Sequence, residues 1–365
     1  MNEKIAFFIP AMYGGGAERV VLNLLEGMTD RGLSLDLVLA AAEGPYMDRI
    51  PKEVNIVDLE AGRIINSIFP LISYLRTHKP RVLISHLNHA NVIALIAGYL
   101  SRTDTPVIVV AHNTLSVARV TQLRGNIVKP IMKWLYPHAS AVATVSLAAA
   151  RDMETELGLP ANSVHTIYNP IVDDRLFAQA QEVNSESWLE PNSPPVYVSI
   201  GRLTEQKDFS TLLKSFALVK ERLDVRLIIL GEGELRSDLM TLIQELGITE
   251  SVSLPGFVKN PYPYLKAASA FVLSSLWEGL PTVLVEAMAC GCPVIATDCP
   301  SGPLEILERG KYGTLVPVSN VRELSQAMLK VLDSPPSAEL LIERSQDFAV
   351  ERSVTEYLKL IEKVC

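Results

Sequence analysis

The feature that most constrains the fold is an alternation of short apolar runs, rich in β-branched residues, with longer amphipathic or alanine-rich segments. Such runs predict buried strands, and the segments between them predict helices. A strand, a helix and a second strand in this order form the βαβ unit of a parallel sheet. In the first half of the chain the predicted strands read IAFFI, LDLVLA, RVLIS, PVIVVA and SAVATVS.

The alternation is interrupted once, at residues 183–195, where Asn, Ser and Pro gather and no periodicity is left. It then restarts with VYVSIG, RLIILG, SVSL, AFVLSS and PVIAT. We therefore predict an α/β chain of two doubly wound, Rossmann-like domains, 1–182 and 196–349, joined by a linker at 183–195. Residues 350–365 have apolar side chains at helical spacing, and we expect this last helix to pack back on the first domain.

Charge and composition exclude several classes of partner. The net charge of −8 argues against binding to nucleic acid, which needs a basic surface. Residues 1–168 carry 15 basic and 14 acidic side chains, whereas residues 169–365 carry 18 and 27, so an anionic partner is expected to meet the first half. No apolar run approaches the ~20 residues that span a bilayer. The four cysteines lack the paired spacing of a zinc site, and a reducing cytoplasm is the expected location.

A glycine-rich loop follows the first predicted strand. Gly15 and Gly16 lie in MYGGGAERV, directly before a predicted helix. Glycines at this position expose backbone N–H groups where the helix dipole favours phosphate. Arg19 stands where a dinucleotide motif would have its third glycine, which counts against a dinucleotide site. A tight turn without ligand explains the same pattern equally well.

Two loops of the second domain carry opposite charges at the ends of predicted strands. Arg202 and Lys207 follow the strand VYVSI, and two cations there suit a diphosphate, although a solvated turn has the same composition. Glu278 and Glu286 stand eight positions apart in EGLPTVLVE, where Pro281 suits a first helical turn. Ligands of doubly wound sheets bind beyond the carboxyl ends of the strands, so the loops after Ile9, Ile200, Leu230 and Ser275 are expected to face one crevice.

Together these segments resemble the retaining GT-B glycosyltransferases, the family 4-like or group 1 enzymes that assemble bacterial lipopolysaccharide and other glycans. The resemblance covers nearly the whole chain, and its residues are GGGAERVVLNL, AHN at 111–113, IYNP at 167–170, GRLTEQKDF at 201–209, LGEGELR at 230–236, LPGFV at 254–258 and SLWEGLPTVLVEAMACGCPVIATD at 275–298. It implies two Rossmann-like domains that face a central cleft, the first binding the acceptor and the second the nucleotide sugar.

The resemblance also implies roles for individual residues. Arg202 and Lys207 would bind the donor diphosphate and assist its departure, and Glu278 would contact the sugar hydroxyls. Glu286 would bind the ribose, and His112 would orient the transferred sugar. The remaining donor-binding positions are Gly15 and Gly16 at the diphosphate, Gly231, Phe257 and Val258 at the nucleobase, and Gly279, Leu280 and Thr282 at the start of the helix that contains Glu286.

The implied reaction is retaining transfer of a hexose or N-acetylhexosamine from a nucleotide diphosphate sugar, UDP-linked by resemblance, to a glycan or lipid-linked acceptor in bacterial-type surface polysaccharide or glycoconjugate synthesis. No cofactor is expected, and no Asp-x-Asp metal clamp occurs, so catalysis is predicted to be metal-independent. Front-face substitution and double displacement through Glu278 both stay open. The alternatives are a nucleotide-sugar epimerase or phosphorylase on the same fold and a non-catalytic nucleotide-binding module.

Two smaller clusters have competing explanations. His86 and His89 follow the strand RVLIS with a spacing that a metal could use, but no carboxylate lies nearby in sequence, so acceptor-facing or capping histidines are preferred. Cys290 and Cys292 lie at a predicted helix-to-strand turn, where small buried side chains explain them better than a redox role.

Residues 116–138 predict peripheral contact with the inner face of the membrane, because cations alternate there with apolar residues and no acidic side chain intervenes. A core helix whose lysines snorkel to solvent is the alternative, and Pro130 must kink the helix or start a new one. The cations are Arg119, Arg124, Lys129 and Lys133, and the apolar residues are Val120, Leu123, Ile127, Val128, Ile131, Met132, Trp134 and Leu135.

Overall fold

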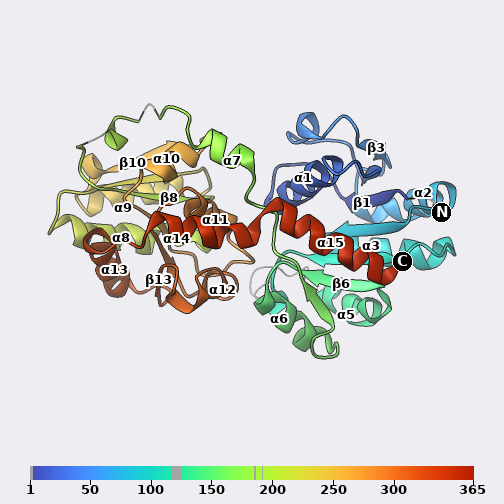
Figure 1. Ribbon diagram of the computed structural model, residues 1–365. Helices are drawn as coiled ribbons and strands as arrows, with labels where there is room; N and C mark the ends of the chain where they lie inside the picture. Colours follow the sequence, from blue (N-terminus) through green and yellow to red (C-terminus); the bar gives the residue numbers. More distant parts are fainter. Residues whose placement is uncertain (1–2, 117–124, 185, 191) are drawn as a thin grey trace. The chain divides into compact units, whose positions relative to one another are not determined.

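The computed structural model describes residues 3–116, 125–184, 186–190 and 192–365. The chain divides into two compact units, residues 1–171 with 350–365 and residues 172–349. Each unit is a parallel α/β sheet with helices on both faces (Figure 1), which confirms the predicted fold class. The second unit begins before the predicted linker 183–195, because Asn260 donates hydrogen bonds to Gln179 O and to the Glu182 carboxylate.

The first sheet has the strand order β3-β2-β1-β4-β5-β6-β7 in the described residues. The apolar runs predicted from the sequence form its centre, where β1, β2, β4 and β5 are buried along their whole length. The bounds are β1 Ile5–Ile9, β2 Leu35–Leu39, β3 Asn55–Asp58, β4 Val82–His86, β5 Val107–Ala111, β6 Ala141–Thr144 and β7 Val164–Thr166.

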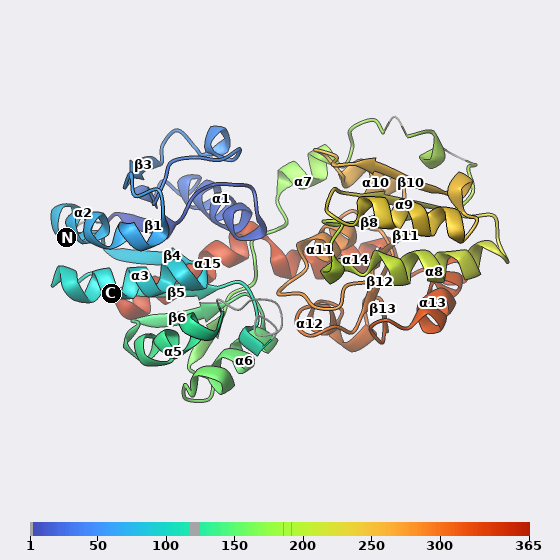
Figure 2. The same ribbon diagram turned by 180° about the vertical axis from the view of Figure 1, so that it is seen from behind.

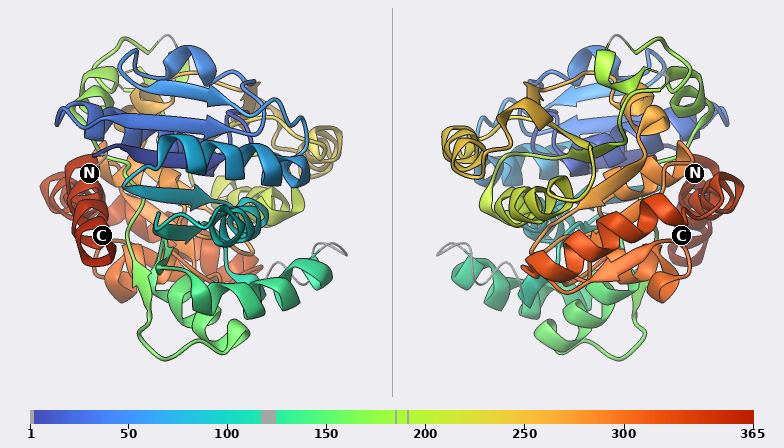
Figure 3. Two further views of the ribbon diagram at one scale, coloured as in Figure 1. Left: turned by 90° about the vertical axis from the view of Figure 1, so that its right-hand side faces the viewer. Right: turned by 90° about the vertical axis from the view of Figure 1, so that its left-hand side faces the viewer.

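Alternate residues of β1 enter different cores, as the period of two in a strand requires. Ile5, Phe7 and Ile9 pack with one set of helices, and Ala6 and Phe8 pack with another. The left view of Figure 3 shows this layering, with the C-terminal helix in red on one side of the sheet. The first core is covered by α1 Gly16–Thr29 and α15 Val350–Val364, and the second by α2 Ile68–His78, α3 Asn88–Ser101, α5 Gly125–Leu135 and α6 Leu147–Leu157.

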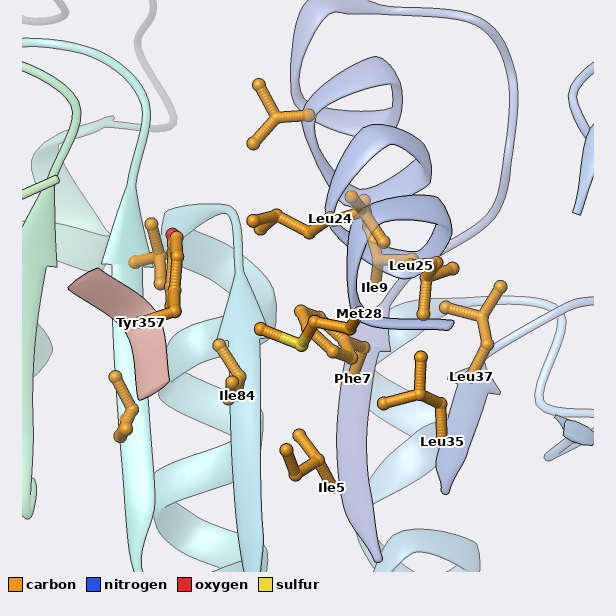
Figure 4. Packing of buried hydrophobic residues seen from close by; sticks show 14 of the residues in the cluster. Ile5, Phe7, Ile9, Leu24, Leu25, Met28, Leu35, Leu37, Ile84 and Tyr357 are labelled. Atoms are coloured by element: carbon orange, nitrogen blue, oxygen red, sulfur yellow. The ribbon is translucent and has the colours of Figure 1, made fainter. Parts of the chain in front are cut away.

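The C-terminal helix α15 is part of the first unit's core. Val354, Tyr357 and Ile361 are at most 2% exposed and pack against α1 and the strands. Figure 4 shows the side chains of this layer, with Tyr357 beside Ile84 and with Phe7 and Met28 between α1 and the sheet. The predicted return of the last helix to the first domain is therefore observed.

The second sheet has the order β10-β9-β8-β11-β12-β13. Helices α8, α9 and α13 pack on one face of it, as Figure 2 shows for α8 and α9. The strands are β8 Val196–Ile200, β9 Arg226–Leu230, β10 Val252–Gly256, β11 Ala270–Leu273, β12 Val294–Thr297 and β13 Thr314–Val316. The helices are α7 Asp174–Gln179, α8 Phe209–Lys220, α9 Arg236–Glu245, α10 Tyr262–Ala267, α11 Thr282–Ala289, α12 Pro303–Ile306, α13 Val321–Asp333 and α14 Ala338–Ser345.

In both sheets the strand order reverses direction beside the first strand of the unit, at β1/β4 and at β8/β11. The loops that leave neighbouring strands at such a switch point diverge to opposite faces of the sheet and open a crevice at their carboxyl ends. This geometry selects the loops after β8 and β11 in the second unit, and the loops after β1 and β4 in the first, as places for a ligand.

Candidate functional site

The switch point of the second unit brings Lys207 and Glu278 together. Lys207 follows β8 and Glu278 follows β11, and Lys207 Nζ lies 2.6 Å from Glu278 Oε1. Ser275 Oγ donates a second hydrogen bond to the same oxygen at 2.7 Å. The Glu278 side chain is 8% exposed and the Lys207 side chain 15%. Because both bonds end on Oε1, Oε2 keeps its capacity to accept from a ligand hydroxyl.

Hydrogen bonds between the two loops hold this pair in place. Ser274 Oγ donates to Lys207 O at 2.7 Å, and Gln206 Nε2 donates to Trp277 O at 2.8 Å. Leu276 N donates to Gln206 O at 2.8 Å. These bonds fix the backbone on both sides of the ion pair, so the lysine and the carboxylate are preorganised before any ligand arrives.

Arg202 lies on the same loop as Lys207, but it is exposed, and its side chain makes no hydrogen bond or ion pair with the residues that the structure describes. The predicted pair of cations therefore splits into one lysine held by a carboxylate and one arginine open to solvent. An arginine in this state can supply a bidentate donor to a phosphate without first breaking an internal contact.

Glycines let the backbones of the loops after β8, β9 and β10 approach one another closely. Gly231 has φ 146°, and a Cβ there would lie 1.9 Å from Gly201 O. Gly231 N donates to Gly256 O at 2.8 Å, which joins the loops after β9 and β10. Phe257, directly after Gly256, is 79% exposed, and Val258 is half-buried. The residues predicted for the nucleobase thus lie at the ends of adjacent strands, although their contact with a base stays a prediction.

The second carboxylate lies within α11, as the sequence predicts. Glu286 is 1% exposed, and Thr282 is the first helical residue. Pro281 occupies the N-cap position, one residue earlier than the predicted first turn. Gly279 and Leu280 precede it and are buried, and Ser301 Oγ donates to Gly279 O at 2.7 Å. Glu286 is therefore a buried carboxylate one turn into the helix that follows the Glu278 loop.

In the first unit, Gly15 and Gly16 stand at the start of α1 as predicted. Gly15 is the N-cap residue with extended backbone, and no side chain caps the helix. Both glycines are exposed. The helix therefore begins with backbone N–H groups that are accessible to an anion.

His112 directly follows β5 and is paired with a second histidine. His86 Nδ1 and His112 Nε2 are 2.9 Å apart, and His86 is fully buried at the end of β4. Burial lowers the pKa of His112 to about 4 and lowers the pKa of His86 well below its usual value. The preferred sequence interpretation of His86 as acceptor-facing or capping is wrong, because its ring has no access to solvent. His89, in contrast, is exposed on the first turn of α3.

The side chains that could bind a metal ion are dispersed over the described structure. Within residues 3–116, 125–184, 186–190 and 192–365, no group of three or more His, Cys, Asp or Glu side chains has the geometry to hold a metal ion. Burial, reinforced by the Glu286 charge, raises the pKa of Cys290 to about 12, and burial also raises the pKa of Cys292. Both are therefore protonated thiols at neutral pH, in agreement with a packing role.

Two family models match consecutive parts of the chain. The model described as Glycosyltransferase Family 4 matches residues 14–175, and the model described as Glycosyl transferases group 1 matches residues 180–348. The first match contains the glycine loop and the histidine pair, and the second contains the Lys207–Glu278 pair. The two matches together account for nearly the whole chain.

Individual proteins agree with these matches. The chain is 29% identical over 350 residues to an N-acetylgalactosamine-N,N'-diacetylbacillosaminyl-diphospho-undecaprenol 4-alpha-N-acetylgalactosaminyltransferase from Campylobacter jejuni, a match that covers 91% of this chain and 90% of the relative. It is 29% identical over 339 residues to an uncharacterized glycosyltransferase from Methanocaldococcus jannaschii, a match that covers 82% of this chain and 84% of the relative. HepE from Anabaena, solved in complex with UDP, superposes with a TM-score of 0.79 at 21% identity over 98% of this chain and 99% of HepE. The chain therefore belongs to the group 1 glycosyl transferases, with a family 4 domain in its first half, and has the GT-B fold.

Proposed function

We propose that the protein transfers a hexose or N-acetylhexosamine from a nucleotide diphosphate sugar, UDP-linked, to a glycan or lipid-linked acceptor with retention of anomeric configuration. The observation that carries this proposal is the Lys207–Glu278 pair at the switch point of the second unit. A lysine there compensates the charge of a departing diphosphate, and a carboxylate with one open oxygen accepts from sugar hydroxyls. The UDP complex of HepE supports a uridine nucleotide.

The other site residues take complementary roles in this proposal. Arg202 binds the diphosphate from the solvent side, and Glu286 binds the ribose. The nucleobase contacts Gly231, Phe257 and Val258, while Gly279, Leu280 and Thr282 bind the donor at the start of the helix that contains Glu286. From the first unit, Gly15 and Gly16 bind the diphosphate through backbone N–H groups, and His112 orients the sugar.

Transfer needs neither a metal nor a cofactor in this account, because Arg202 and Lys207 supply the positive charge that a divalent cation supplies elsewhere. The nucleotide sugar is a substrate, and the leaving nucleotide carries the negative charge that develops. Loss of activity in EDTA that magnesium restores would contradict this part of the proposal.

The acceptor is proposed to be lipid-linked, on a bacterial-type surface polysaccharide or glycoconjugate. The C. jejuni relative is named for a diphospho-undecaprenol substrate, which is a membrane lipid. No helix in the described residues is long and apolar enough to cross a bilayer. We propose further that the protein is cytoplasmic and meets its acceptor at the membrane surface.

The described part of the predicted membrane segment supports this contact only in part. Trp134 is 71% exposed and Ile131 39%, and Lys133 is exposed beside them on α5, a continuous helix that contains Pro130. The prediction that Lys129 is a free cation facing the membrane is wrong, because Lys129 forms an ion pair with Glu156 of α6. Arg119, Val120, Leu123 and Arg124 lie outside the described residues.

Further exposed apolar side chains lie on the neighbouring helices. Tyr99 on α3 is 85% exposed and Phe69 on α2 is 79% exposed, and α3 packs against both α2 and α5. Aromatic side chains beside a lysine are suited to the interface between headgroups and acyl chains. The proposed contact surface therefore consists of Phe69, Tyr99, Ile131, Lys133 and Trp134.

The donor is tested by thermal shift with UDP-, GDP- and ADP-linked sugars. A ligand that binds only the native state at 100 times its Kd stabilises that state by about 2.7 kcal/mol. We expect a rise in Tm with UDP-sugars, loss of that rise in Arg202→Ala, and an unchanged rise in Arg222→Ala, an exposed arginine on the same unit. Equal shifts in the two variants would contradict the diphosphate assignment.

The membrane contact is tested separately by flotation with anionic and neutral liposomes at low and moderate salt. We expect wild type to float with anionic liposomes and the Lys133→Glu, Trp134→Ala double variant to float less. Lys214→Glu on α8 is the matched charge control, because this exposed lysine lies on the second unit. Equal flotation of wild type and the double variant would refute the surface without affecting the donor assignment.

A further inference from the structure

His86, the buried histidine of the first unit, has no part in the donor site described above. His86 is the last residue of β4 and stacks on Phe7, with ring centroids 5.9 Å apart. His112 follows the neighbouring strand β5, and the two rings are joined only through His86 Nδ1 and His112 Nε2 at 2.9 Å. His86 Nε2 is buried and has no hydrogen-bond partner in the described structure.

One proton lies between the two rings, because burial keeps both imidazoles neutral at neutral pH. If His112 donated this proton, His86 would carry its own proton on Nε2 and bury an N–H group without an acceptor. If His86 donates it, Nε2 is a bare lone pair. A buried N–H without a partner is the rarer of these defects in native proteins.

We infer that His86 is a positioning residue that donates Nδ1–H to His112 Nε2 and so holds His112 with its proton on Nδ1. His112 Nδ1 makes no hydrogen bond with the described residues. Its N–H therefore serves as a neutral donor to an oxygen of the bound sugar. This last step rests on the proposed function, whereas the tautomer itself rests on the His86–His112 contact and on the buried, unpartnered His86 Nε2.

The same contact also fixes the orientation of the His112 ring. A neutral imidazole without a partner can exchange its tautomer and rotate, and its alternative tautomer would present a lone pair to the sugar oxygen instead of a donor. Loss of the His86 donor is therefore expected to lower kcat/KM for the donor substrate while the Lys207–Glu278 site stays intact.

The tautomer is measured directly by NMR on protein labelled with ¹⁵N-histidine, in which the six histidines give few signals. We expect the His112 signals, assigned through His112→Asn, to show a protonated Nδ1 and a bare Nε2. In His86→Phe we expect this pattern to be lost. Protonated Nε2 at His112 in wild type, or an unchanged pattern in His86→Phe, would overturn the inference.

Kinetics then separate positioning from folding. His86→Phe and His86→Gln remove a donor at the Nδ1 position, and we expect kcat/KM to fall about 10- to 100-fold. His86→Asn keeps a donor there and should recover most of this loss. His165→Phe, a half-buried histidine on β7, is the control without effect. Equal losses in the Asn and Phe variants would refute positioning, whereas the predicted tautomer without sugar transfer from any donor would refute only the proposed function.

Discussion

At the scale of single residues, the candidate site depends on a carboxylate that one lysine and one serine hold. Lys207→Ala should leave the Glu278 carboxylate, 8% exposed, without its cation. We expect this to cost about 1–3 kcal/mol of unfolding free energy, in addition to a large loss of rate. Arg202→Ala should lower the rate about 100-fold yet change stability by less than about 0.5 kcal/mol, because Arg202 is exposed and has no described partner.

The control for this prediction is the double variant Lys207→Met, Glu278→Gln. It removes both charges, so urea unfolding should show recovered stability while the enzyme stays inactive. If Lys207→Ala unfolds at the same urea concentration as Arg202→Ala, the ion pair contributes nothing to the fold.

The histidine pair makes stability depend on pH. Burial lowers the pKa of His112 to about 4, below the value of about 6.5 in the unfolded chain. Between these two values the unfolded state binds the proton and the folded state does not, so stability falls as pH decreases from 6.5 toward 4. The expected slope from this residue is about 1.4 kcal/mol per pH unit.

Comparison of wild type with His112→Asn removes this contribution, while the titrating groups outside the His86–His112 pair are common to both proteins. Urea unfolding at pH 6.5, 5.5 and 4.5 should show a shallower loss of stability in the variant. Parallel curves would mean that His112 titrates normally in the folded state.

The positions of Lys207 and Glu278 could be predicted from the sequence because each follows a strong strand signal by a few positions, whereas their part in donor binding stays a prediction. Lys207 and Glu278 are 71 residues apart, yet both follow central strands of one sheet. The His86–His112 contact was missed because it depends on the register of β4 against β5. The available signal was that each histidine stands at the carboxyl end of one of two consecutive predicted strands.

At the scale of elements, the strands absent from the prediction are β3, β7 and β13, which lie at sheet edges. They have three or four residues each, and β3 is largely exposed, so they carry little of the apolar signal that identifies a buried strand. The central strands and the helix beginning near Pro281 were predicted, because strand burial and helix-start residues are local features.

The loop after β9 provides a test of how closely these elements pack. Gly231 has φ 146°, and Gly231→Ala would place a methyl group 1.9 Å from Gly201 O, so the backbone of one of the two loops must move. We expect a loss of about 2–4 kcal/mol and weaker donor binding. Gly247→Ala is the matched control, because its φ is 68° and no atom lies within 4 Å of the added Cβ; it should cost only about 1 kcal/mol. Equal losses, measured by urea unfolding, would contradict the close contact.

At the scale of the whole molecule, two sheets of the same kind present different groups for the proposed reaction. The first unit offers backbone N–H groups at α1 and the histidine pair, and the second offers the cations and carboxylates. The unit boundary differs from the predicted one because residues 172–182 bond to the second unit. Composition marked a polar stretch at 183–195, but contacts made by α7 determine where the unit begins.

The most direct test of the account is transfer itself. The purified protein is incubated with radiolabelled UDP-α-N-acetylhexosamine or UDP-α-hexose and a polyprenyl-diphosphate-linked oligosaccharide, in EDTA. The account predicts label in the lipid-linked fraction, one UDP released per sugar transferred, and an α-linked product identified from the coupling of its anomeric proton. UDP release without a new glycosidic bond, a β-linked product, or an epimerised free nucleotide sugar would contradict it.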